Sequence, residues 1–228
     1  MQYIDYIVQH YGWQGTALAG VILLLSFIQL YYHIVVYGGV ARFRNSRRRK
    51  IHDTEPPISI VIPIFSEDYN YLDTRLHDIM GQQYPTNFEL VLVYVGADND
   101  YFEELNKMRL RYPNLVVTRI YEPRFPITVK LALNIGIKSA HYEHIVITTA
   151  DAAPASEQWL ATMGKAFMRG NIVLGYTAIE PAKGLTNYLI RMSRMQISTY
   201  WLASAVNGRT YRGSRHNFGF TRSLYFGN

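Results

Sequence analysis

Beyond residue 56, runs of apolar residues alternate with stretches in which apolar residues recur every three or four positions. The runs predict buried strands, and the stretches predict helices with one apolar face. The expected strands span residues 58–64, 88–95, 114–121, 144–149 and 171–177, and the expected helices span residues 71–82, 101–112, 128–140 and 156–169. Ser156 is the expected cap of the last helix. Such alternation is typical of βαβ units, so the sequence predicts an α/β domain with a mainly parallel sheet flanked by helices.

The pattern changes after residue 177. Residues 184–207 predict one long helix that carries apolar and basic side chains on different sides. A helix of this kind lies on a membrane surface or packs on a sheet, and the sequence leaves both interpretations open. The tail over residues 208–228 is rich in Gly, Arg, Tyr and Phe and predicts no particular element.

An uncharged apolar stretch precedes the α/β pattern. Residues 16–41 contain no Asp, Glu, Lys or Arg, and about 20 apolar residues suffice for a helix to cross a bilayer. Trp13 and Tyr37 lie toward its two ends, where amphipathic rings favour the headgroup layer. A cleaved signal peptide is the competing interpretation, but it would carry basic residues before a shorter apolar core. We therefore expect an uncleaved transmembrane helix over residues 16–41.

The positive charge of the chain is concentrated directly after this helix. Six of the 23 basic residues lie within residues 42–50, and the remaining 17 equal the 17 acidic residues in number. By the positive-inside rule, the basic linker over residues 42–57 and the domain over residues 58–228 are expected to be cytoplasmic, with residues 1–15 outside the cell (inner) membrane. A basic run can also bind nucleic acid. Next to a membrane span, anionic lipid is the nearer partner, so membrane lipid and no nucleic acid are expected.

Candidate binding residues follow the expected strands. In an open parallel sheet, ligands bind at the carboxyl ends of the strands. Glu67 follows the first strand, Asp98 the second, Lys130 the third and Asp151 the fourth. Each has a structural alternative, because acidic residues also cap helices or form turns and a lysine in a first helical turn is often solvated. Their occurrence at consecutive strand ends favours a shared binding site.

Asp151 has surroundings that suit a metal ion bound to phosphate. The sequence contains neither GxGxxG after the first strand nor GxxxxGK[ST], so the common phosphate-binding loops are missing. A diphosphate can instead be neutralised by Mg²⁺ or Mn²⁺, which take one or two protein carboxylates together with phosphate oxygens and water. Small residues flank Asp151 in the segment TTADAAP and leave room for such a site. The chain has no cysteine, which excludes disulfides and cysteine metal sites.

Three segments together resemble the family 2 glycosyltransferases. They are SIVIPIFSED from residue 59, KLALNIGIKSAHYEHIVITTADAAPASEQWL over residues 130–160, and YRGSRHNFGFTRSLYF over residues 211–226. The resemblance implies a Rossmann-like GT-A fold and transfer of a hexose from a nucleotide-diphospho-sugar to a glycan or lipid-linked acceptor at the cytoplasmic membrane face. It further implies inversion at the sugar and a divalent cation, Mg²⁺ or Mn²⁺, held by Asp151.

The resemblance assigns further site residues, and Asp98 is added because it follows the second expected strand. The expected donor-binding residues are Pro63, Glu67, Asp98, Lys130 and Asp151, and the expected acceptor-side residues are Arg215, His216 and Asn217.

The chain departs from the family pattern at several positions. Thr149 stands where the DxD motif has its first carboxylate, and Tyr94-Val95-Gly96 stands where Asp-Asp-Gly usually ends the second strand. The general base and the QxxRW segment of the family follow the region matched here. The catalytic base is therefore expected beyond Asn228, and residues 58–228 are expected to be incomplete at the C-terminus. A second interpretation follows from the missing carboxylates: a degenerate, non-catalytic membrane-anchored scaffold or partner in polysaccharide assembly.

Overall fold

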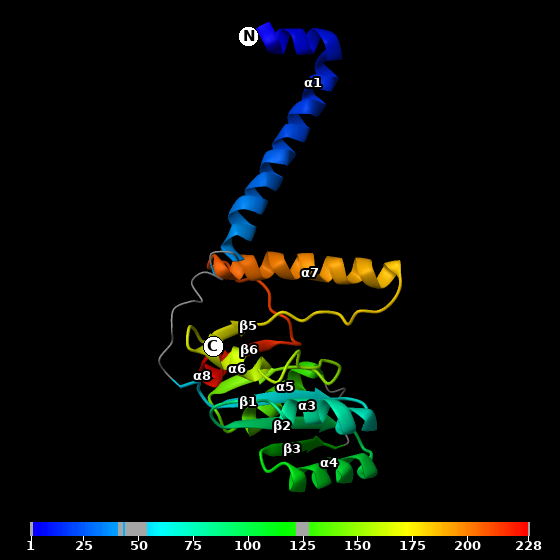
Figure 1. Ribbon diagram of the computed structural model, residues 1–228, viewed down its shortest axis with the longest axis vertical. Helices are drawn as coiled ribbons and strands as arrows, with labels where there is room; N and C mark the ends of the chain where they lie inside the picture. Colours follow the sequence, from blue (N-terminus) through cyan, green and yellow to red (C-terminus); the bar gives the residue numbers. More distant parts are fainter. Residues whose placement is uncertain (1, 41–42, 44–53, 122–127, 228) are drawn as a thin grey trace. The chain divides into compact units, whose positions relative to one another are not determined.

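The computed structural model describes residues 2–40, 43, 54–121 and 128–227 (Figure 1). The expected basic linker over residues 42–57 lies largely outside these residues. The chain divides into two compact units. One comprises residues 1–50 and 178–212, and the other comprises residues 51–177 and 213–228.

The second unit is built on a six-stranded sheet with the order β3-β2-β1-β4-β6-β5 (Figure 1). Its strands are β1 (Ile58–Ile64), β2 (Phe88–Val95), β3 (Leu115–Ile120), β4 (His144–Ile147), β5 (Ile172–Leu174) and β6 (Phe218–Thr221). The first four are mutually parallel, and β6 runs antiparallel to both β4 and β5. The predicted mainly parallel sheet is confirmed, and β6 comes from the tail to which the sequence assigned no element.

Helices cover both faces of the sheet because successive side chains of a strand point to opposite faces. On one face, Ile60 and Ile62 belong to a core that includes residues of α3 (Leu76–Met80), α4 (Asn99–Arg111) and α6 (Trp159–Phe167). On the other face, Val61 packs with residues of α5 (Val129–Ser139), and α8 (Arg222–Phe226) contributes the ring of Tyr225. A π-helical turn, η2 (Tyr71–Arg75), leads into α3. Apolar side chains therefore fill both faces of the sheet, and the polar side chains described below lie at the ends of its strands.

The predicted start of α6 is wrong. The helix begins at Trp159, three residues later than predicted, and the hydroxyl of Ser156 accepts a hydrogen bond of 3.3 Å from the backbone N–H of Gln158 in the turn before the helix, not from a residue of the helix itself. The amide oxygen of Gln82, two residues after the end of α3, accepts a hydrogen bond of 3.0 Å from the backbone N–H of Leu160. The same side chain donates to the carbonyl of Ser156 at 3.0 Å. A side chain from the loop after α3 thus satisfies a backbone N–H at the start of α6, which the local sequence could not indicate.

The first unit contains α1 (Gln2–Tyr31), the π-helical turn η1 (Tyr32–Tyr37) and α7 (Leu185–Val206). Within α1, Gly12 has φ 67°, a left-handed conformation that glycine adopts readily, and it divides the helix. The segment Gly12–Val40 has 29 residues and is long and apolar enough to cross a membrane. The predicted helix over residues 184–207 is confirmed as α7. It contacts η1, and the ring centroids of Tyr37 and Tyr200 lie 5.0 Å apart.

Candidate functional site

The carboxyl ends of β1, β2, β3 and β4 lie at one edge of the sheet because these strands are parallel and in register. Glu67 follows β1, Asp98 follows β2 and Asp151 follows β4. Pro63 lies within β1 and is buried against Val93 of β2, with which it is paired. The edge therefore gathers the acidic residues that the sequence analysis singled out.

Asp151 lies in the turn after β4 with its side chain 77% exposed. Its carboxylate caps no helix, and its Oδ1 lies 3.8 Å from Nδ1 of His216. A hydrogen bond from the Thr149 side chain, followed by the charges of His216 and Arg215, holds the pKa of Asp151 below its usual value. The guanidinium of Arg75, from η2, donates to the backbone carbonyl of Asp151 at 3.1 Å. Asp151 is thus an ionised, accessible carboxylate on a turn that is tied to the neighbouring helix.

His216 is fixed beside Asp151 by the two threonines that follow β4. The hydroxyl of Thr148 donates to the backbone carbonyl of His216 at 2.9 Å, and the hydroxyl of Thr149 shares a hydrogen bond of 2.6 Å with Nδ1 of His216. The imidazole is largely enclosed, with 18% of its side chain exposed. The threonine at the first position of the DxD pattern therefore orients an imidazole next to the remaining carboxylate.

Tyr94 occupies the end of β2 where the family pattern has a carboxylate. Its ring is fully buried, and its hydroxyl donates to Oε1 of Glu67 at 2.7 Å and accepts from the backbone N–H of Asp98 at 3.2 Å. Burial, and then the hydrogen bond to Glu67, raise the pKa of Tyr94 to about 12, so the phenol stays protonated and donates. A Cβ on Gly96 would collide with this hydroxyl. Tyr94 thus orients Glu67 and requires glycine two positions later.

Asp98 has a structural role in the same cluster. Its carboxylate accepts a hydrogen bond of 2.9 Å from the backbone N–H of Tyr101 and caps α4. Capping uses one lone pair of one carboxylate oxygen.

Arg119, near the end of β3, is a residue of this edge that the sequence did not single out. Its guanidinium donates to the carbonyls of Gly96 and Asp98, at 3.1 and 3.2 Å, and to Oδ1 of Asn99 at 2.9 Å. It also lies 4.7 Å from the ring centroid of Tyr121, within the range of a cation–π contact. The available signal was a lone arginine in an otherwise apolar strand. The residue ties the ends of β2 and β3 together and adds a positive charge to this edge.

The other expected residues differ in their surroundings. Lys130 is exposed in the first turn of α5, and Arg215 is exposed just before His216. Asn217 joins separate elements, since its side chain accepts from Nε1 of Trp159 at 3.2 Å and donates to the carbonyl of Tyr176 at 3.1 Å. The structure therefore brings His216 to Asp151, whereas the side chain of Asn217 connects α6 to the segment after β5.

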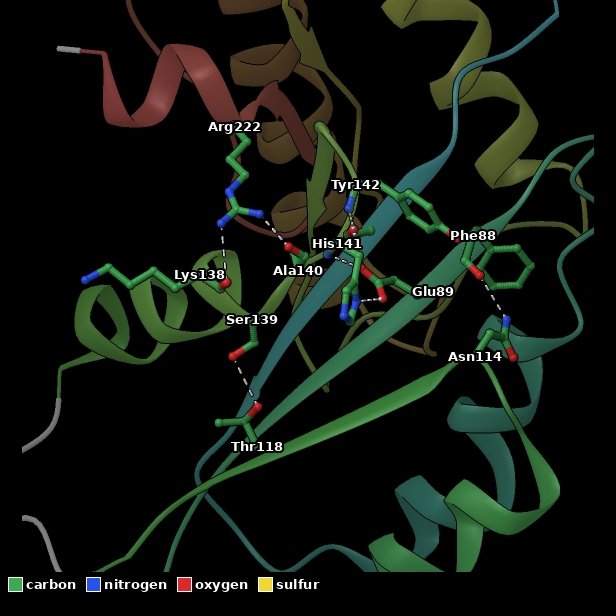
Figure 2. A network of polar contacts seen from close by, with 11 residues as sticks. Phe88, Glu89, Asn114, Thr118, Lys138, Ser139, Ala140, His141, Tyr142 and Arg222 are labelled. Carbon is green, nitrogen blue, oxygen red and sulfur yellow. Dashed lines mark hydrogen bonds and ion pairs between the residues drawn. The ribbon is translucent and has the colours of Figure 1, made fainter.

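A different polar network lies at the amino ends of the strands, opposite to Asp151 (Figure 2). Glu89 of β2 is 6% exposed. Its Oε1 accepts from the hydroxyl of Ser59 and from the backbone N–H of His141, both at 2.6 Å, and its Oε2 pairs with Nδ1 of His141 at 2.7 Å. Its oxygens are already occupied by protein donors, so this carboxylate holds the sheet to the loop before β4. Asp151 differs because it is accessible.

The residues around Asp151 fit a cation that is shared with a phosphate. Among the residues that the structure describes, no three His, Cys, Asp or Glu side chains form a group that could hold a metal ion. Mg²⁺ and related cations in phosphate-binding sites nevertheless need only one or two protein ligands, because phosphate oxygens and water complete the coordination. An exposed, ionised carboxylate meets that requirement.

Comparison with solved structures gives the fold. A mannosyltransferase, PcManGT from Pyrobaculum calidifontis in complex with GDP-Man and Mn²⁺, matches with a TM-score of 0.56 and 18% identity over 89% of this chain. The chain covers 57% of the length of that protein. TarS from S. aureus (residues 1–349) matches with a TM-score of 0.46 and 20% identity, over 56% of this chain and 38% of TarS. The match to the mannosyltransferase shows that the sheet is of the expected GT-A type.

Comparison with protein families gives the family. A search of curated proteins gave no match. The family model described as glycosyl transferase family 2 matches residues 59–226, which include both the Tyr94 cluster and the Asp151–His216 pair. The chain therefore belongs to glycosyl transferase family 2.

Proposed function

We propose that the chain transfers a hexose from a nucleotide-diphospho-sugar to a glycan or lipid-linked acceptor at the cytoplasmic face of the cell membrane, with inversion and with a divalent cation. The observation that carries the proposal is Asp151, an accessible, ionised carboxylate at the carboxyl end of β4. Family membership supplies the reaction class, and the GT-A sheet supplies the edge at which a nucleotide binds.

In this mechanism Asp151 would hold Mg²⁺ or Mn²⁺ against the diphosphate of the donor. The cation, when bound, offsets the charge that develops on the departing nucleoside diphosphate. Glu67, oriented by Tyr94, would accept hydrogen bonds from hydroxyl groups of the donor. Arg75 would keep the Asp151 turn in position through its backbone carbonyl. Inversion by direct displacement further requires a base near the acceptor hydroxyl, for which we assign no residue within 1–228.

A transfer assay tests the proposed reaction. The chain, reconstituted in lipid vesicles with Mn²⁺, would be incubated with radiolabelled GDP-mannose or UDP-GlcNAc, the types of donor bound by the solved relatives. Label should pass into lipid or polysaccharide from at least one donor. Failure of both donors to bind would contradict the proposal. Binding without transfer would mean that residues 1–228 hold the donor but do not complete the reaction, which is the result expected for the non-catalytic scaffold and equally for a transferase whose base lies outside these residues.

The membrane part of the proposal rests on the first unit. The segment Gly12–Val40 would cross the bilayer with its N-terminus outside. Because α7 contacts the end of this segment through Tyr37 and Tyr200, α7 would lie at the level of the lipid headgroups. One face of α7 carries exposed apolar side chains at helical spacing, namely Leu185, Tyr188, Leu189, Met192 and Met195. Such a face suits the boundary between headgroups and acyl chains.

Fluorescent labelling tests the position of α7. The chain has no cysteine, so single variants Leu189→Cys and Arg191→Cys can each carry one environment-sensitive NBD label in the reconstituted protein. At position 189 we expect blue-shifted emission, and we expect lipids with a doxyl group near the headgroup to quench it. At position 191 we expect weaker quenching by the same lipids. Blue-shifted emission at position 189 without lipid quenching would mean that protein covers this face, and water-like emission would also contradict membrane contact.

A further inference from the structure

We propose that His216 is the second protein ligand of the cation, in place of the carboxylate that Thr149 replaces. The inference rests on the proposed function and goes beyond it, because it assigns a mixed imidazole and carboxylate site to a position where the family pattern has two carboxylates. Both side chains come from segments far apart in sequence, the turn after β4 and the residues before β6. They meet because β4 and β6 are paired, with Ile147 opposite Phe218.

The separation of the two donor atoms fits one cation. Nδ1 of His216 and Oδ1 of Asp151 are 3.8 Å apart. Two ligand atoms that each lie about 2.1 Å from a cation are separated by about 3.0 Å when adjacent in an octahedron and by about 4.2 Å when opposite. The observed separation equals neither value, so the two atoms must shift relative to each other by about 0.4–0.8 Å for both to bind one cation.

The surroundings of His216 prepare the imidazole for this role. Its backbone is held by the hydroxyl of Thr148, and its ring is largely enclosed, so little side-chain freedom is lost on binding. Thr149 shares a hydrogen bond with Nδ1. On cation binding, that nitrogen would present its lone pair to the cation and the ring proton would reside on Nε2, while the hydroxyl of Thr149 would retain its hydrogen bond to Asp151. Thr149 thus positions the imidazole before the cation binds, and on binding Nδ1 exchanges this hydrogen bond for the cation.

An imidazole changes which cations the site prefers. A neutral imidazole supplies one negative charge fewer than a carboxylate, and it suits transition metals better than Mg²⁺. The site should therefore favour Mn²⁺ and Co²⁺ over Mg²⁺ when a nucleoside diphosphate is bound. The variant His216→Asp should shift this preference toward Mg²⁺.

Electron spin-echo spectroscopy of bound Mn²⁺ tests the ligand directly. The full chain in detergent would be loaded with Mn²⁺ and either GDP or UDP, and the echo would be analysed for modulation by a coordinated imidazole nitrogen. We expect this modulation in the unaltered chain and its loss in His216→Gln, together with an increase of at least about tenfold in the Kd of Mn²⁺. His141→Gln, which changes a histidine at the opposite edge of the sheet, should leave both properties unchanged.

The outcomes separate this inference from the proposed function. If Mn²⁺ binds, depends on Asp151 and shows no nitrogen modulation, His216 is not a ligand and the inference is wrong while the proposed function stands. If Mn²⁺ does not bind with either diphosphate, both are wrong. A rescue variant adds a further check: Thr149→Asp in the His216→Gln background should restore binding with a preference for Mg²⁺. Restored binding without that preference would contradict the role of the imidazole.

Discussion

The substitution Gly136→Ala tests the close packing of α5 on the sheet. A Cβ at this position would lie 2.5 Å from Cγ1 of Val61 and 2.8 Å from Cγ2 of Val93. Carbon atoms in favourable contact are about 3.5–4.0 Å apart, so the helix or both valines must move by roughly 1 Å. The valines are fully buried and stiff at χ1 because they are branched at Cβ. Relief by a side-chain rotation is therefore not available.

Two opposing effects set the size of the change. Alanine is favoured over glycine in a helix interior by about 1 kcal/mol. Overpacking of a buried contact costs about 1–3 kcal/mol, and two rigid neighbours favour the upper part of that range. The overpacking cost should win, with a net loss of about 1–2 kcal/mol in the free energy of unfolding. At about 2–4 °C per kcal/mol for a chain of this size, Tm should fall by several degrees.

Thermal unfolding of the purified chain in detergent would measure this effect. Gly170→Ala is the matched control, because a Cβ there would have no atom within 4 Å. Val61→Ala should partly relieve the collision, so the double variant should lose less stability than the sum of the single variants by about 1 kcal/mol. A Gly136→Ala protein as stable as the unaltered chain, or additive effects with Val61→Ala, would refute the packing argument.

Two further predictions concern buried polar groups. Tyr94→Phe should lower the free energy of unfolding by about 1–2 kcal/mol, because it leaves the N–H of Asp98 without its hydroxyl partner and frees Glu67. Calorimetry should also show weaker nucleotide binding by this variant. Unchanged stability and affinity would contradict this prediction. Burial lowers the pKa of His144 below the value of about 6.5 that it has when unfolded. Its contribution to stability is therefore full above about pH 6.5 and is lost as the pH falls toward the folded pKa. His144→Phe should weaken the loss of stability between pH 7 and pH 5 in denaturant titrations, and an identical pH dependence in both proteins would argue against this assignment.

The sequence predicted β1 and β2 closely because these strands are buried on both faces. β1 and β2 have the predicted limits, since a continuous apolar run is a strong local signal. β6 was not predicted because its four residues gain their order from pairing with β4 and β5, which lie far away in sequence. The start of α6 was predicted wrongly for a similar reason, since its capping group belongs to Gln82.

In the candidate site, too, single residues could be predicted from the local sequence, whereas contacts between distant segments could not. The position of Asp151 after an apolar strand indicated an accessible carboxylate, and the structure has it exposed. The resemblance assigned His216 to the acceptor side, and only the antiparallel pairing of β6 brings its ring to Asp151. Tyr94 could be identified as a departure from the family pattern, but its hydrogen bond to Glu67 depends on the turn after β1. Contacts between distant segments were therefore the part that local patterns could not supply.

The most direct test of the account compares nucleotide binding with and without metal. Isothermal titration calorimetry would measure the affinity of GDP and of UDP for the full chain and for Asp151→Asn, each in the presence of Mn²⁺ and of a chelator. We predict that Mn²⁺ strengthens binding of at least one nucleotide by tenfold or more, about 1.4 kcal/mol, and that Asp151→Asn removes this gain while the chain remains folded. Equal affinity with Mn²⁺ and with chelator in the unaltered chain would contradict the claim that Asp151 holds a cation against the diphosphate.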